Sequence, residues 1–199
     1  DNLMQNIEVN ILYLNNIIVG FMLLSKAYFT TTTQLIQLLI RKEIIMSREN
    51  TQKILNQTLA DLSQFAAIIH QVHWYVRGEN FYGVHELMDK FLDEANEAVD
   101  EVAERLITIG GAPYSSLKEF AENSKLETAK GDYSVSIESH IKTLISGYKY
   151  LAKLYREGIE VSDKEDDAVT ADLFTGLLAG TEKTLWMLNA TLNKAPELE

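Results

Sequence analysis

Cysteine is absent from this chain of 199 residues, and proline occurs only twice. The lack of cysteine excludes disulfides, thiolate metal ligands and thiol catalysis, and it leaves the redox compartment undecided. With 2 prolines and 10 glycines, the sequence permits long uninterrupted helices. It shows no strand pattern, no glycine-rich phosphate loop and no internal repeat. The sequence therefore predicts an all-α protein, and its length is typical of one domain with a sizeable core.

Positive charge is scarce as well. The chain has 18 lysines and arginines against 29 aspartates and glutamates, which gives a net charge of −11. Such a protein repels phosphate backbones, so binding to nucleic acid would need a local basic patch. It attracts cations, but most acidic surfaces are only solvated. The charge alone assigns no function.

The first 45 residues differ from the rest. They contain three acidic and three basic residues, so residues 46–199 carry the whole net charge. Residues 9–25 are an uncharged run of 17, at the lower limit for a membrane span, but the run contains three asparagines. The segment also lacks the basic start of a signal peptide.

We favour the hypothesis that Met46 is the true start and that residues 1–45 are upstream translation. Their residue types correspond to AT-rich codons, and residues 41–43 can back-translate into a purine run where a bacterial ribosome-binding site would lie. The alternatives are a genuine disordered extension and a membrane anchor. We expect residues 46–199 to form the folded domain of a cytoplasmic protein.

Apolar residues recur at helical spacing through this second part. Segments 77–80 and 110–113 contain glycine or proline and are predicted to end the first two helices. Ser162-Asp163-Lys164-Glu165 has the form of a capping box and is predicted to begin the last helix. We expect a four-helix bundle with an extra short helix between the second and third helices. The predicted elements are long helices over 49–76, 82–109, 133–158 and 162–193, and a short helix that opens at Ser116.

The second predicted helix carries a polar stripe. At 100° per residue, with His85 at zero, Asp89 falls at about 40°, Asp100 at about 60° and Glu104 at about 100°. The apolar residues lie at about 200° to 300° and mark the face toward the core. These core-facing residues are Val84, Leu87, Met88, Phe91, Ala95, Ala98, Val102 and Leu106.

The stripe consists of two separate pairs. His85 and Asp89 are one turn apart, as are Asp100 and Glu104, so each pair can converge on one ion. The centres of the pairs lie roughly 22 Å apart along the helix, which is too far for one metal centre. Two antiparallel copies about a two-fold axis would form two identical centres. His73, near the end of the first helix, can join His85.

Two imidazoles and three carboxylates suit iron, manganese or zinc better than calcium or magnesium. Open coordination positions would admit an oxidant. The alternative is a solvated acidic face with structural histidines. His70 breaks the pattern and is interpreted as structural, and His140 is assigned no role.

Three blocks carry a family resemblance. Residues 70–78 (HQVHWYVRG), 85–89 (HELMD) and 100–106 (DEVAERL) strongly resemble the Dps mini-ferritins, and the resemblance extends over about residues 50–196. It implies a ferritin-like bundle and a hollow dodecamer built from two-fold dimers. A two-metal ferroxidase centre would lie at each dimer interface. It would take His73, His85 and Asp89 from one subunit and Asp100 and Glu104 from its partner.

By this resemblance, two Fe²⁺ ions would be oxidised, by hydrogen peroxide in preference to oxygen, and ferric mineral would be stored in the shell as a protection against oxidative stress. Zinc or manganese could replace iron. Trp74, beside His73, would donate electrons or would only pack at the interface. Asp163, Asp167 and Asp172 would line an iron-entry pore or form a solvated helix start.

The main alternative is a shell that binds DNA, which usually needs a tail rich in lysine and arginine. After Met46 only Arg48 and Lys53 precede the bundle's first apolar turn, and residues 193–199 contain one lysine. DNA binding is therefore not expected. A second alternative is a purely structural helical oligomer with an inert acidic stripe.

Overall fold

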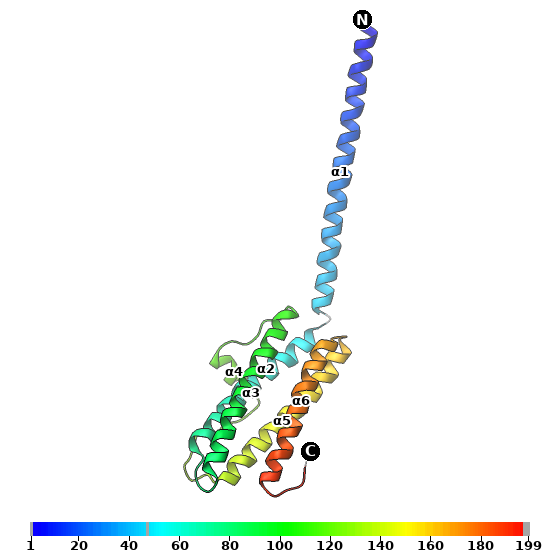
Figure 1. Ribbon diagram of the computed structural model, residues 1–199. Helices are drawn as coiled ribbons and strands as arrows, with labels where there is room; N and C mark the ends of the chain where they lie inside the picture. Colours follow the sequence, from blue (N-terminus) through cyan, green and yellow to red (C-terminus); the bar gives the residue numbers. More distant parts are fainter. Residues whose placement is uncertain (1, 47, 197–199) are drawn as a thin grey trace. The chain divides into compact units, whose positions relative to one another are not determined.

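The computed structural model describes residues 2–46 and 48–196, and these residues form six helices and no strand. The chain divides into two compact units, residues 1–47 and residues 48–199. Figure 1 shows the helices of each unit.

The first unit is a single helix, α1 (Asn2–Met46). Several of its large apolar side chains are exposed, among them Tyr13, Phe21 and Phe29. Over the described residues, no helix is long and apolar enough to cross a membrane. The hypothesis that translation begins at Met46 stays a prediction.

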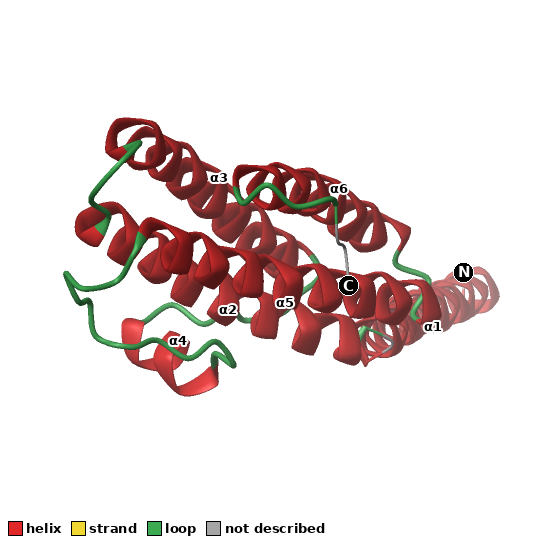
Figure 2. Ribbon diagram, turned by 90° about the horizontal axis from the view of Figure 1, so that it is seen from below, coloured by secondary structure: helices red, strands yellow, loops and turns green. Residues whose placement is uncertain are grey.

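The second unit is a four-helix bundle with one additional short helix. Its long helices lie side by side, and the short helix packs against α2 in the connection between α3 and α5 (Figures 1 and 2). The predicted all-α architecture, including the extra helix between the second and third long helices, is confirmed. The helices are α2 (Glu49–Tyr75), α3 (Phe81–Thr108), α4 (Leu117–Asn123), α5 (Ile137–Lys164) and α6 (Ala168–Thr191).

The core lies between the four long helices. α2 packs along α3, and α5 packs along α6. Phe65 on α2 is buried and meets the ring of Tyr148 on α5 edge-on, with 4.7 Å between the ring centroids. The predicted core face of α3 is confirmed, except that Leu87 is only half-buried and Leu92 is buried in addition.

The boundary between α5 and α6 differs from the prediction. α5 continues through Gly158 and Ser162 to Lys164, and Asp167, rather than Ser162, is the N-cap of α6. Gly158 does not end the helix. It is a glycine for another reason, because any side chain at this position would collide with the ring of Phe174 on α6. The glycine thus allows close helix packing, and the apparent capping box is the last turn of α5.

A buried carboxylate ties the α3–α5 connection to the bundle. Asp61 on α2 is fully buried. It accepts hydrogen bonds from Ser124 Oγ (2.8 Å), Lys125 N (2.6 Å), Tyr150 Oη (2.7 Å) and Gln57 Nε2 (2.8 Å). These four donors satisfy the carboxylate away from water and fix the segment that follows α4.

Candidate metal centre

The turn between α2 and α3 brings two histidines together. α2 ends at Tyr75, and the chain reverses through Gly78 (φ 118°) and Asn80 (φ 63°), in backbone conformations that these residue types tolerate. His73, in the last turn of α2, and His85, in the second turn of α3, then lie with their ring centroids 3.9 Å apart. The predicted proximity of His73 and His85 is present within one chain.

Two neighbours fix the ring of His85. When Nδ1 carries the proton, it donates a hydrogen bond to the carbonyl oxygen of His73 at 3.2 Å. Phe81 stacks on the ring, with 5.0 Å between centroids and 25° between planes. In this tautomer the lone pair of Nε2 is free to bind a metal, and the carbonyl supports the ring from behind.

Asp89 lies close to His73, so the turn gathers a partial cluster of ligand-type residues, His73, His85 and Asp89. Its Oδ1 lies 3.5 Å from Nδ1 of His73, and its side chain is 65% exposed, whereas that of His73 is 15% exposed. The distance is too long for a good hydrogen bond, and Nδ1 of His73 is buried without a hydrogen-bond partner among the described residues. A buried nitrogen of this kind indicates a missing partner. A metal ion or an ordered water would satisfy it.

Asp100 and Glu104 lie on the same helix but away from this cluster. α3 is uninterrupted from Phe81 to Thr108, so the predicted separation of roughly 22 Å applies. Both side chains are exposed. Within the described part of one chain, no group of three or more histidines and carboxylates is placed to hold a metal ion. One chain therefore presents two partial ligand sets, one at the α2–α3 turn and one further along α3, and their meeting across a two-fold axis stays a prediction.

Trp74 and His70 lie beside the cluster. Their rings stack, with 4.9 Å between centroids and 25° between planes, and Trp74 is 67% exposed. The stack gives His70 a packing partner, in line with the structural interpretation of this residue. His140 is buried on α5, and burial lowers its pKa.

The prediction for Asp167 needs a correction. Its carboxylate is only 1% exposed and forms ion pairs with Arg105 on α3 (2.5 Å) and with Arg48 (3.6 Å). It also accepts hydrogen bonds from the backbone N (3.2 Å) and Oγ1 (2.8 Å) of Thr170. A buried, fully paired carboxylate cannot line an aqueous pore. Asp163 and Asp172 are exposed, and their place in a pore stays a prediction.

The turn between α5 and α6 is in fact a structural junction. Glu165 accepts hydrogen bonds from the backbone N of Asn50 (3.1 Å) and of Thr51 (2.8 Å), at the start of α2. Burial raises the pKa of Glu165, but these hydrogen bonds outweigh the effect of burial and leave the pKa below its ordinary value.

The pKa of Asp167 is lowered in a similar way. Burial raises it, but hydrogen bonds from Thr170 and the charges of Arg105 and Arg48 lower it below its ordinary value. No local pattern in the sequence points to this role of Arg105, which is 62 positions from Asp167.

The chain is similar to known proteins over this bundle. Residues 52–198 match the family described as ferritin-like domain. The DNA protection during starvation protein of Streptococcus suis is 48% identical over 152 residues, which cover 76% of this chain and 88% of the relative. The X-ray structure of Dps from Listeria monocytogenes is 44% identical, with a TM-score of 0.72, over 73% of this chain and 95% of that one. A zinc-soaked Dps structure from Listeria innocua is 44% identical, with a TM-score of 0.71, over 73% and 98% of the two chains.

Proposed function

The chain belongs to the ferritin-like family, among the DNA protection during starvation proteins, and on that basis we propose that it oxidises Fe²⁺ at a two-metal centre shared by two subunits. The family supports iron storage and stress protection in general. The finer proposal depends on one observation. Helix α3 carries two pairs of ligand-type residues, His85 with Asp89 and Asp100 with Glu104, away from its buried face and too far apart to meet within one chain.

A two-fold axis would convert these partial sets into complete centres. Two antiparallel copies of α3 would place His73, His85 and Asp89 of one subunit opposite Asp100 and Glu104 of the other. Five donors shared by two ions leave coordination positions open for an oxidant. The unpartnered Nδ1 of His73 and the oriented ring of His85 support a ligand role for both histidines.

The redox chemistry follows from a centre of two irons. Each bound Fe²⁺ gives one electron, and hydrogen peroxide with two protons accepts both electrons and becomes two molecules of water. Because the two electrons are delivered together, no hydroxyl radical is released. Hydrogen peroxide is thus the preferred oxidant in this proposal, with oxygen as the alternative.

Storage requires an enclosed space. We propose that twelve subunits, arranged as two-fold dimers, form a shell in which the ferric product is kept as mineral. Asp163 and Asp172, which are exposed near the α5–α6 turn, would guide Fe²⁺ into it. Zinc or manganese would occupy the same ligands as iron. Trp74 would supply electrons when oxidant exceeds iron, because its exposed indole adjoins His73 in the chain.

Stopped-flow absorbance of Fe³⁺ formation tests the ligand set. Metal-free protein is loaded anaerobically with Fe²⁺ and mixed with hydrogen peroxide. We expect Asp100→Ala/Glu104→Ala to abolish the fast phase. The control variant Glu122→Ala/Glu127→Ala removes two exposed carboxylates outside α3 and should keep that phase. Fast oxidation that survives the loss of Asp100 and Glu104 would refute the proposed centre.

Direct DNA binding is a separate question, raised by the name of the relatives. We propose that protection here does not require it, because the net charge is −11 and residues 193–199 contain a single lysine. A gel shift at low salt with metal-free protein is expected to leave the DNA unretarded. Retarded DNA would contradict this.

A further inference from the structure

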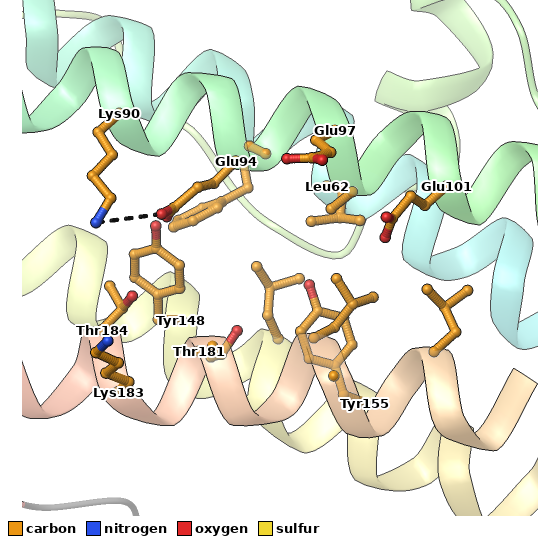
Figure 3. Close-up of a pocket in the computed structure, with 18 of the residues that line it drawn as sticks. Leu62, Lys90, Glu94, Glu97, Glu101, Tyr148, Tyr155, Thr181, Lys183 and Thr184 are labelled. Carbon is orange, nitrogen blue, oxygen red and sulfur yellow. Dashed lines mark ion pairs between the residues drawn. The ribbon is translucent and has the colours of Figure 1, made fainter.

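A cavity of about 560 Å³ opens between α3 and α6 (Figure 3), and neither His73 nor His85 lines it. Its floor is formed by apolar side chains of α2, α5 and α6, including Leu62, Leu151 and Leu177. The volume lies in the range of small-molecule sites, and a mostly apolar lining with a few polar groups is typical of them. We call this cavity the α3–α6 groove.

Two tyrosines reach into the groove from α5. Tyr148 is 8% exposed and Tyr155 is 2% exposed, and both hydroxyl groups point toward α3 (Figure 3). Neither hydroxyl has a hydrogen-bond partner among the residues that the structure describes, and burial raises the pKa of both phenols. Neither oxygen is among the fully buried side-chain atoms that lack a partner, so both hydroxyls open onto the groove. They are therefore placed to hydrogen-bond to a molecule that lies in it.

The α3 side of the rim carries three glutamates, and Lys90, Lys183 and Asp172 also line the groove. Glu94, Glu97 and Glu101 follow one another on α3 at intervals of three and four residues and face the groove (Figure 3). Glu94 is paired with Lys90 at 3.5 Å, whereas Glu97 and Glu101 form no ion pair within the described residues. Two like charges one turn apart repel each other, so a bound cation would relieve the repulsion. From Glu94 to Glu101 the rim extends about 10.5 Å along the helix.

We propose that the α3–α6 groove binds a linear aliphatic polyamine. The methylene chain would lie on the apolar floor, and the ammonium groups would pair with Glu97 and Glu101. The hydroxyl oxygens of Tyr148 and Tyr155 would accept further hydrogen bonds from the amine. A compact metal ion would leave the apolar floor uncovered, and a fatty acid would meet the glutamates of the rim with the wrong charge. The site lies within one bundle and includes none of the five proposed iron ligands.

Calorimetric titration of the full-length, metal-free protein tests this, with spermidine as the probe. Hexaamminecobalt(III) is the control ligand, because it has the same charge of three but no methylene chain. We expect spermidine to bind at least about tenfold more tightly, since each buried methylene group adds favourable transfer free energy. Equal affinities would overturn the proposal and indicate an acidic surface only.

Variants locate the site. Glu97→Gln/Glu101→Gln should weaken spermidine binding by about tenfold or more, whereas the charge-matched pair Glu122→Gln/Glu127→Gln, on α4 and the following connection, should leave it within about twofold. Thr181→Arg, which places a cation in the groove, should abolish binding. An equal loss of spermidine affinity in the two double variants would contradict the assignment. Unchanged spermidine binding in Thr181→Arg would contradict it as well. Thermal unfolding of each variant shows that the bundle is intact.

Discussion

The ion pair between Arg105 and Asp167 gives a quantitative test of how the bundle is held together. Arg105→Ala would leave the buried carboxylate of Asp167 with only Thr170 and the more distant Arg48. Removing one partner of a buried pair typically costs 3–5 kcal/mol, and we take about 3 kcal/mol because Arg48 remains. At a fixed protein concentration this corresponds to a fall of about 6–12 °C in the midpoint of thermal unfolding.

The effect of pH has a definite sign. The pKa of Asp167 is lowered in the folded protein, so the unfolded chain binds the proton more readily. The stabilisation is therefore complete above the unfolded pKa of about 3.9 and is lost as the pH falls through the folded value. Arg105→Ala should be strongly destabilised near pH 7. Its difference from the unaltered protein should shrink below about pH 4.

Urea unfolding at both pH values measures this difference. Lys118→Ala is the control, because Lys118 pairs with Glu122 at 3.7 Å on the surface, with 81% and 62% of the two side chains exposed. Surface pairs contribute about 0–1 kcal/mol, so this variant should change little. Equal free energies of unfolding for the two variants at pH 7 would refute the argument. A difference that grows toward low pH would refute it too.

Two further substitutions probe the packing of the bundle. Gly147→Ala should destabilise it by about 1–3 kcal/mol, because the added methyl group would collide with the buried ring of Phe65. Gly176→Ala should stabilise the helix by roughly 0.5–1 kcal/mol, because the added methyl group meets nothing within 4 Å. Urea unfolding measures both variants, and equal changes in their free energies of unfolding would contradict both expectations. Asp61→Ala should cost about 3 kcal/mol or more, because it leaves buried donors such as Tyr150 unpaired. It should also expose the segment after α4 to proteolysis, and an unchanged cleavage pattern would count against that role.

The sequence predicted those features that depend on short-range periodicity. The core face of α3 follows from its 3.6-residue repeat, and the structure buries the expected residues from Val84 to Leu106. Ser116 caps α4 as expected, and its capping box with Glu119 is formed. The positions of His85 and the carboxylates along α3 were predictable for the same reason.

Features that depend on contacts between distant segments were missed. Gly158 and Ser162 have the residue types of a helix end, but packing against α6 continues the helix through both. Asp167 belongs to an acidic run, and nothing near it in the sequence reveals its pairing with Arg105. The α3–α6 groove depends on the spacing of two helices that are far apart in the chain. Local pattern carries no information about that distance.

Mixed shells test the shared centre most directly. One variant, His85→Ala/Asp89→Ala, lacks one partial ligand set, and Asp100→Ala/Glu104→Ala lacks the other, so each alone should be inactive. In a dimer of the two, one centre takes both altered sets and the other takes both intact sets. Unfolding and refolding the variants together at equal amounts should restore about a quarter of the fast oxidation, because half the dimers are mixed and each has one intact centre. If the mixture is as inactive as its components, the centre is not shared between subunits.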